Sequence, residues 1–559
     1  MELEELLLDA GGFGRFQIFI LLLLFVHRAT LSAHFLLNNF LAVVPPHRCA
    51  IQNKGLLGNI TEEEMLLISI PREPDGTLSS CKMYKEPQWH LLENYTWGPY
   101  NTSTWGPPNV STWISHNTSV LQTCQHGWEY DNSHFSSTIA TEWDLVCEQK
   151  WLNKASATCF FIGVTVGGIL VGYFSDRYGR RTMLLVSCVF SVIFEMAAAA
   201  SVNFIMFAIF QSLSGVALSG FPMMTTSLAL EWVNTKHRTF IGCFMSMYWS
   251  IGFMLLPLVA YLIRDWRWLL VAVTSPYILG IISIWWIPES VRWLLTKGKV
   301  KEAYAVLVRC SSMNGQTHLP SKINIEVLNK LAEEENTGIN YTFIDLFRTP
   351  VLRKVCICIG AVWFGAFISY YGMSLNIIGF ELDMYMTQFL FGAIEMPFKL
   401  VTYISLKKGG RRHALAWSLL IFGFCMAINI VIPESFGVLR TTIAVLGKGF
   451  SGATLTILIL FSAELFPTVI RHNGCGFSSL LGRIGGSLAP LILLLDEVWK
   501  PLPQVICCSV AVASGLITYC LHETLDLQLP ETVKDIENPR DNSMSPVVDP
   551  KEVVEMQKF

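Results

Sequence analysis

The chain carries positively charged side chains inside stretches of sequence that are otherwise apolar. Arg483 stands within LLGRIGGSLAPL (480–491), which is followed by no acidic residue until Asp496. A guanidinium group can hold a carboxylate, sulfate or phosphate through two parallel hydrogen bonds. We therefore predict that Arg483 binds an anion, the alternative being an ion pair with an acid on another helix.

Two lysines occupy similar apolar stretches. A cation near the centre of a bilayer costs roughly 2.5–3.5 kcal/mol, so each must face protein or water. Lys399 follows Glu395 by four residues, a spacing at which helical side chains pair and cancel unless Pro397 between them redirects one. Lys448 is a further candidate, either as a cation of the same site or as a packed residue.

The composition places most of the chain in a membrane. Of its 559 residues 52% are hydrophobic and 15% charged, and the mean hydropathy is +0.44. The net charge of −3 argues against nucleic acid as a partner, because phosphate binding needs a strongly basic surface. The composition indicates the lipid bilayer as a partner.

Twelve apolar runs are long enough to cross a hydrocarbon core of ~30 Å. The first run is too long for the apolar region of a signal peptide, so we expect an uncleaved helix. The runs cover residues 16–44, 151–174, 182–200, 204–228, 239–262, 267–287, 355–379, 386–405, 413–432, 438–461, 475–495 and 503–521. The predicted fold class is an all-α membrane protein of twelve transmembrane helices in two groups of six.

Lysine and arginine gather in the loops on one side of this arrangement, which places both termini in the cytoplasm. Residues 45–150 then form a large extracellular loop. Its acceptor motifs for N-glycosylation are Asn59, Asn94, Asn101, Asn109 and Asn117. Its cysteines, for which three disulfide pairings stay open, are Cys49, Cys81, Cys124 and Cys147.

The predicted organisation has six parts along the chain. They are a cytoplasmic N-terminus with helix one (1–44), a glycosylated, disulfide-bearing extracellular loop (45–150), helices two to six (151–287), a cytoplasmic loop with short amphipathic helices (288–354), helices seven to twelve (355–521) and a mostly disordered cytoplasmic tail (522–559). Phe559, at the end of the tail, is a candidate contact for a scaffold protein.

Three charged motifs of the first half return in the second half at nearly constant spacing. The pairs and their offsets are DRYGRR and KKGGRR (231), EWVNTKHR and ELFPTVIR (233), and PESVRWLL and HETLDLQL (234). A parallel repeat indicates two six-helix bundles that rock about a site near the bilayer midplane. Unless they are simply solvated loop charges, the motif residues are candidates for gating. These candidates are Asp176, Arg180, Glu231, Arg238, Glu289, Arg292, Glu464, Arg471 and Glu523.

The loop sequence GYFSDRYGRR resembles the signature of the major facilitator superfamily. Essentially the whole chain is similar to the organic anion/organic cation transporter (solute carrier 22) family, most of all to its organic anion branch of liver and kidney type and particularly the liver-enriched subfamily. The stretches that carry this similarity are GGFGRFQ, GWEYD, STIATEWDLVCEQ, IRDWRWL, PESVRWLL, DLFRTP, SYYG and LPETVKDIE.

The resemblance implies a multi-pass plasma-membrane transporter of major facilitator fold that moves many organic anions by alternating access, alone or in exchange for another anion. It links Arg483 and Lys399 to the binding of carboxylates, sulfates and phosphates. The cavity residues that it implies are Tyr370, Tyr371, Trp363, Trp249, His34, Phe35, Asn39 and Leu455. Leu455 stands where related anion transporters carry an aromatic residue, so their substrate range does not transfer directly.

Two other functions fit parts of the same sequence. An organic cation or zwitterion carrier would use Glu195 or Glu395 as its ligand. A membrane receptor that transports nothing would use the outer loop, but it has no need of duplicated charge motifs. We expect no enzyme, cofactor or metal, because no catalytic or metal-ligand spacing occurs and GKGFS (447–451) lacks the phosphate-binding loop pattern.

Overall fold

The computed structural model describes residues 6, 8–51, 61–73, 76–88, 91, 120–233, 235–316, 325–336, 343–376, 382–467, 469–525, 530 and 533–537. The chain divides into two compact units. Unit 1 comprises Met1–Phe40, Lys154–Ile263 and Arg267–Phe559, and unit 2 comprises Leu41–Asn153 and Arg264–Trp266.

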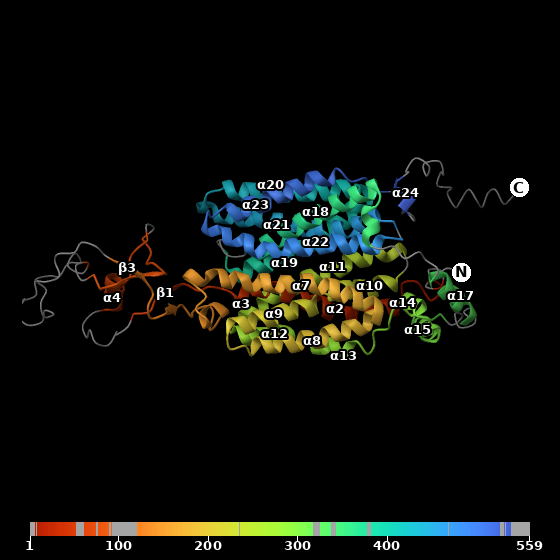
Figure 1. Ribbon diagram of the computed structural model, residues 1–559, viewed down its shortest axis with the longest axis horizontal. Coiled ribbons are helices and arrows are strands. Elements are labelled where there is room, and N and C mark those ends of the chain that lie inside the picture. The colour runs from red at the N-terminus through yellow and green to blue at the C-terminus, as the bar shows by residue number, and fades with distance from the viewer. Residues whose placement is uncertain are drawn as a thin grey trace, which may run out of the picture. The chain divides into compact units, whose positions relative to one another are not determined.

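Unit 1 is built from long apolar helices in two halves. The N-terminal half contains α2 (Arg15–Leu36), α3 (Asn38–Leu41), α7 (Lys150–Tyr178), α8 (Arg180–Ala199), α9 (Phe204–Leu218), α10 (Phe221–Glu231), α11 (Thr235–Leu262), α12 (Trp266–Thr274) and α13 (Pro276–Ser283). The C-terminal half contains α18 (Pro350–Ser374), α19 (Met384–Lys408), α20 (Arg411–Val431), η4 (Glu434–Phe436), α21 (Gly437–Leu465), α22 (Arg471–Ile492), η5 (Leu493–Glu497) and α23 (Leu502–Thr518). Figure 1 shows the halves as two layers of roughly parallel helices.

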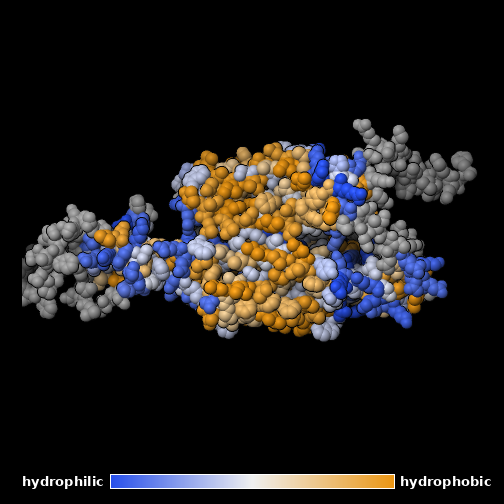
Figure 2. All heavy atoms as spheres, in the orientation of Figure 1, coloured by the Kyte–Doolittle hydropathy of each residue, from blue (hydrophilic) through white to orange (hydrophobic). Residues whose placement is uncertain are grey.

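The lengths of these helices match a bilayer. In the described residues, 11 helical spans are long and apolar enough to cross a membrane, and α23 adds a shorter apolar helix of 17 residues. At 1.5 Å per residue α23 extends over about 26 Å, a little less than the hydrocarbon core. Apolar side chains cover the outer face of the helices in Figure 2. The predicted all-α membrane fold is confirmed.

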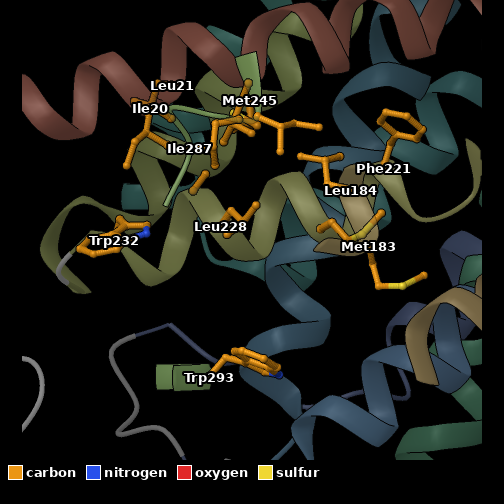
Figure 3. Close-up of a cluster of buried hydrophobic side chains, with 14 of the residues drawn as sticks. Ile20, Leu21, Met183, Leu184, Phe221, Leu228, Trp232, Met245, Ile287 and Trp293 are labelled. Atoms are coloured by element: carbon orange, nitrogen blue, oxygen red, sulfur yellow. The ribbon is translucent and has the colours of Figure 1, made fainter. Parts of the chain in front are cut away.

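Tight packing holds the helices of unit 1 together, since lipid tails provide no hydrophobic drive for helices to associate. Helix α11 packs along both α2 and α19, and α18 packs along α22. At Gly252 on α11 a Cβ atom would overlap the Ala29 carbonyl of α2, so glycine permits this contact. Figure 3 shows the apolar core of the N-terminal half, where Leu21, Leu228 and Met245 from three helices converge.

Short helices cover one end of unit 1, which we call the α14 end (Figure 1). They are α14 (Val291–Thr296), α15 (Val300–Met313), α17 (Ile325–Asn336), η3 (Phe343–Phe347) and α24 (Val533–Glu537). Leu307 of α15 and Leu328 of α17 are fully buried in the core of the N-terminal half. The amphipathic pattern of this segment is therefore used to pack it onto the helix bundle.

Unit 2 is a small unit with short strands and two disulfides. Strand β1 (His47–Cys49) pairs antiparallel with β4 (Trp128–Tyr130), and β2 (Lys82–Tyr84) pairs antiparallel with β3 (Leu121–Thr123). Its helices are α4 (Glu62–Ser69), α6 (Ile139–Glu142) and η2 (Cys147–Gln149). The disulfides, which supplement a small core, are Cys49–Cys124 and Cys81–Cys147. The predicted glycosylation sites lie outside the described residues: Asn59, Asn94, Asn101, Asn109 and Asn117.

Candidate functional site

Arg483 on α22 reaches from the C-terminal half into the N-terminal half. Its Nη1 donates to the Val164 carbonyl of α7 at 3.1 Å, and its Nη2 donates to the Ser219 carbonyl at 3.3 Å. Ser219 follows the last residue of α9, where carbonyls lack helical partners and carry partial negative charge. In the described part of the chain Arg483 forms no ion pair with an acid.

Small residues on α7 and α22 make room for this contact. A Cβ atom at Gly168 of α7 would overlap the Arg483 guanidinium. Next to it the Thr165 and Ser487 hydroxyls lie 3.1 Å apart and link the same two helices. Helix α22 is continuous, and a Cβ at Gly485 would overlap the backbone of α18. The glycines around Arg483 therefore allow the helices to approach closely.

Aromatic rings from both halves form a wall beside Arg483. Phe35 on α2 lies 5.4 Å from Trp249 on α11 and 6.2 Å from Tyr371 on α18, measured between ring centroids. Phe161 on α7 lies 4.7 Å from Tyr371. Trp249 Nε1 donates to the Tyr370 hydroxyl at 2.9 Å, which joins α11 to α18. The structure thus brings together four of the predicted cavity residues.

Two predicted cavity residues lie behind this wall. Trp363 donates through Nε1 to the Ser462 hydroxyl at 2.8 Å, and its ring packs 5.4 Å from Phe367. Phe367 in turn contacts Tyr371 at 5.8 Å. Leu455 packs against the apolar cores of both halves. Trp363 and Leu455 therefore support the wall from the C-terminal half.

A buried carboxylate holds two lysines at the interface between the halves. Glu395 on α19 pairs with Lys399 at 2.9 Å and with Lys448 of α21 at 3.1 Å. The Tyr370 hydroxyl donates to Glu395 at 2.9 Å, and Ser250 of α11 donates to it at 2.8 Å. Lys399 is thus paired with Glu395, which was one of its two predicted arrangements. Because two lysines already engage Glu395, it is not free to bind a cation.

His34 points into the N-terminal half and does not join the wall. Its Nδ1 lies 3.0 Å from the Thr30 carbonyl, and its Nε2 lies 3.2 Å from the Thr274 hydroxyl. Glu195 is also near, 3.9 Å from Nε2, and it accepts a hydrogen bond from Ser214. His34 and Glu195 therefore belong to a polar cluster inside the half.

Asn39 connects the two halves at the end opposite α14. Its Nδ2 donates to the Ser374 carbonyl at 2.8 Å and to Gln388 Oε1 at 3.0 Å. Beside it the rings of Phe40 and Tyr385 stack with centroids 5.5 Å apart. Asn39 thus takes part in closing the interface between the halves and does not lie beside Arg483.

One charged residue of the first span was not among the predicted site residues. Arg28 on α2 has buried Nε and Nη1 atoms without a hydrogen-bond partner among the described residues. The sequence could have identified Arg28 as a candidate, because His27 and Arg28 interrupt the apolar run at 16–44.

At the α14 end of the N-terminal half, charged motif residues form a compact cluster. Arg180 Nε lies 3.1 Å from Glu231. Glu289 accepts hydrogen bonds from the backbone N–H groups of Arg180 and Arg181, both at 3.1 Å. These are the first residues of α8, so the carboxylate caps the positive end of that helix. Gly179 precedes them with a positive φ of 101°.

The C-terminal half repeats this cluster. Arg411 Nε lies 3.1 Å from Glu464, and Glu523 accepts from the backbone N–H groups of Arg411 (2.7 Å) and Arg412 (3.2 Å), the first residues of α20. Gly410 precedes them with φ 81°. Burial opposes ionisation of Glu523, but its backbone donors outweigh burial and hold the pKa of this carboxyl below its ordinary value.

One ion pair at the α14 end joins the two halves. Asp176 of α7 lies 3.5 Å from Nε2 of His472 on α22. The neighbouring Arg471 donates through Nε to a carbonyl at the end of α21, at 3.2 Å. Of the remaining predicted gating residues, Arg292 lies in the first turn of α14, and the side chain of Arg238 lies outside the described residues. His472 and Arg411 were not predicted.

Comparisons with known proteins agree with this architecture. A model of the sugar (and other) transporter family matches residues 110–532. Solute carrier family 22 member 7 from Homo sapiens is 47% identical over 540 residues, covering 96% of each chain. Solute carrier family 22 member 6 from Pseudopleuronectes americanus is 37% identical, covering 96% of this chain and 95% of the relative. A solved structure of the major facilitator superfamily proton:xylose symporter XylE superposes with a TM-score of 0.53 at 18% identity, covering 70% of this chain and 90% of the symporter.

Proposed function

We propose that this chain, which belongs to solute carrier family 22 within the sugar (and other) transporter family, carries small organic anions across the plasma membrane by alternating access. As a member of these families it is a multi-pass membrane transporter and not an enzyme. The anions are carboxylates, sulfates and phosphates, taken up alone or in exchange for another anion.

The contact of Arg483 with two backbone carbonyls is the observation that supports this function most. The carbonyls of Val164 and Ser219 are neutral, whereas a substrate carboxylate is charged. The present bonds carry charge on the donor only, whereas a carboxylate adds an opposite charge and accepts two parallel N–H···O bonds from the guanidinium fork. An entering anion therefore competes successfully for the guanidinium and releases α22 from α7 and α9.

This exchange of partners couples binding to movement. In this structure the hydrogen bonds of Arg483 connect the C-terminal half to the N-terminal half. An anion that accepts hydrogen bonds from Arg483 in place of the two carbonyls breaks this connection. A ligand shifts a conformational equilibrium only by binding one state better than the other. The charge balance favours anions as well, since Lys399 and Lys448 share the single acid Glu395.

The orientation in the membrane follows from the distribution of cations. The α14 end carries Arg180, Arg181, Lys299, Arg411 and Arg412, and positive loops face the cytoplasm. Both termini are then cytoplasmic and unit 2 is extracellular. Glycosylation of unit 2, and a scaffold contact at Phe559, which lies outside the described residues, stay predictions.

Uptake of labelled salicylate into cells tests the role of Arg483. We expect Arg483→Ala to lower uptake at least about tenfold at equal surface expression, since two charge-assisted hydrogen bonds are lost. Arg353→Ala, an exposed cation of α18, is the matched control and keeps wild-type uptake. Normal uptake by Arg483→Ala would remove the site assignment, and uptake of tetraethylammonium in place of salicylate would identify a cation carrier.

The close contact between the Arg483 guanidinium and Gly168 of α7 gives a second test. Gly168→Ala places a methyl group in the space of the guanidinium, whereas Gly172, one turn away, has its nearest neighbour at 3.8 Å from a Cβ position. We expect Gly168→Ala to change the apparent KM for salicylate several-fold and Gly172→Ala to leave it unchanged. Equal effects of the two substitutions would contradict the role of this contact.

A further inference from the structure

An acid and a base lie together inside the N-terminal half, and we call them the His34–Glu195 pair. Nε2 of His34 on α2 lies 3.9 Å from Oε1 of Glu195 on α8, and both side chains are almost fully buried. Ser214 donates to Oε1, whereas Oε2 is buried and has no hydrogen-bond partner among the described residues. A buried carboxylate with so few donors is unfavourable in its charged form unless a cation accompanies it.

The hydrogen bonds of His34 leave room for the second proton of an imidazolium. Its Nδ1 lies 3.0 Å from the Thr30 carbonyl, which can only accept, so Nδ1 carries a hydrogen. Its Nε2 lies 3.2 Å from the Thr274 hydroxyl. That hydroxyl donates to the Leu270 carbonyl at 2.7 Å, so its oxygen acts as an acceptor toward His34. Both ring nitrogens therefore face acceptors, which suits a protonated ring beside a carboxylate.

The surroundings of the His34–Glu195 pair supply no charge that would replace a proton. Tyr277 of α13 contacts the imidazole with ring centroids 5.2 Å apart, and it interacts electrostatically with the carboxylate and with the Cys188 thiol of α8. His27 and Arg28 lie about two turns earlier on α2, roughly 10 Å along its axis. The other helices packed around α2 and α8 contribute uncharged groups at this level, namely Ser214 on α9, Phe221 on α10, Trp249 on α11 and Thr274 on α12. With one proton the pair is neutral, and with none or two it carries a net charge that none of these groups compensates.

Helix α9 connects this pair to Arg483. Ser214 on α9 donates to Glu195, and the carbonyl of Ser219, five residues further along, accepts from Arg483. An anion that takes Arg483 away from Ser219 therefore releases the end of the helix that supports Glu195. His34 lies in the last turn of α2 and Glu195 near the end of α8, and both helices begin at the α14 end. In the proposed orientation the pair thus lies toward the extracellular side.

We propose that His34 and Glu195 form a proton-binding site and that the transporter takes up one proton with each organic anion. This inference deepens the proposed function and rests on it. The pair receives its proton from the extracellular side, is neutral while it is buried, and releases the proton in the inward-facing state, in which α9 has separated from Arg483. The membrane potential opposes entry of an anion alone, whereas an anion and a proton together move no net charge.

Proteoliposomes that contain the purified protein and a trapped pH-sensitive dye test this site, with the membrane potential clamped by potassium and valinomycin. The probe is labelled phenyl sulfate, which stays ionised at every pH used and cannot itself carry a proton. In the wild type we expect uptake to acidify the lumen, and an external pH about one unit below the internal pH to raise accumulation up to about tenfold. Glu195→Gln should still exchange labelled for unlabelled phenyl sulfate but lose the acidification and the response to the gradient. Glu302→Gln, at an exposed acid, is the matched control and should behave as the wild type.

A second variant tests the histidine. His34→Gln removes the imidazole beside the carboxylate, so Glu195 should hold its proton more tightly and the pH of half-maximal stimulation should rise. His126→Gln, at an exposed histidine of unit 2, is its control and should leave that pH unchanged.

The wild type alone decides the coupling, whether or not the variants fold. Uptake of phenyl sulfate without acidification, or without a response to the pH gradient, would overturn the inference. Full coupling in Glu195→Gln, or an unchanged pH response in His34→Gln, would overturn the assignment to this pair. If the wild type takes up no phenyl sulfate under any gradient, the proposed function fails and this inference with it, whereas uptake without protons overturns this inference alone.

Discussion

The charged clusters at the α14 end of the two halves share one construction and differ in one acidic position. In each half a glutamate caps the third membrane span of that half, α8 by Glu289 and α20 by Glu523. In each half an arginine at the start of that helix also pairs with a glutamate. Asp176, however, has Lys407 at the equivalent position of the C-terminal half.

The duplicated glutamates stabilise each half by itself, whereas Asp176, which has no acidic counterpart, contacts the other half. The contacts of Glu289 and Glu523 lie within one half, so they persist while the halves rock as rigid bodies. The pair of Asp176 with His472 runs between the halves and must break when this end opens. We therefore propose that gating by charge depends on the acid that the repeat does not duplicate.

Removing the capping glutamates should have the largest effect. Glu289→Ala and Glu523→Ala each leave backbone N–H groups of α8 or α20 without their charged acceptor, and we expect each to destabilise the protein by about 2–4 kcal/mol. Thermal unfolding of the purified protein in detergent measures the loss. Glu302→Ala, which removes an exposed acid paired with Lys299, is the control and should change little. A large loss in only one half would break the equivalence of the two clusters.

The repeat predicted these clusters better than it predicted the contact between them. The offset of 231 that aligns the two motifs also places Arg411 opposite Arg180, so its ion pair could have been anticipated from the sequence. The pairing of Lys399 with Glu395 followed from their spacing. His472 could not be anticipated, because its partner depends on how the halves approach each other.

Rotation of a helix about its axis limited the prediction of the site in the same way. His34 and Phe35 are neighbours on α2, yet Phe35 contacts the aromatic wall and His34 points into its own half. The contact of Arg483 with the Ser219 carbonyl likewise depends on the break between α9 and α10. Sequence spacing identified the charged residues, but only the packed structure assigns their partners.

Breaking the contact between the halves should alter transport more than stability. The side chains of Asp176 and His472 are 51% and 63% exposed, and exposed pairs contribute about 0–1 kcal/mol. We expect Asp176→Asn to change the maximal rate of salicylate uptake several-fold while Tm moves by no more than about 2 °C. Glu302→Gln, which removes an exposed pair within one half, is the control.

A charge swap sharpens this prediction. The double variant Asp176→His with His472→Asp restores the pair with its direction reversed, so its uptake rate should return toward the wild-type value. If the swap behaves like the sum of two damaging substitutions, the pair does not control the opening of the α14 end. If Asp176→Asn alone leaves the rate unchanged, the acid has no role in gating.

The smallest effect concerns the response of the C-terminal cluster to pH. The backbone donors that hold the pKa of Glu523 below its ordinary value favour its ionised form in the folded protein. A carboxyl with a depressed pKa adds stability above the pKa of the unfolded chain, about 4.3, and that stability is lost as the pH falls toward the folded value. Glu523→Gln keeps one acceptor oxygen, so we expect its Tm to lie below wild type by a constant small difference between pH 6 and 8 and to converge with wild type only below about pH 4.3. A difference that already narrows between pH 6 and 8 would show that a group other than Glu523 controls the cluster.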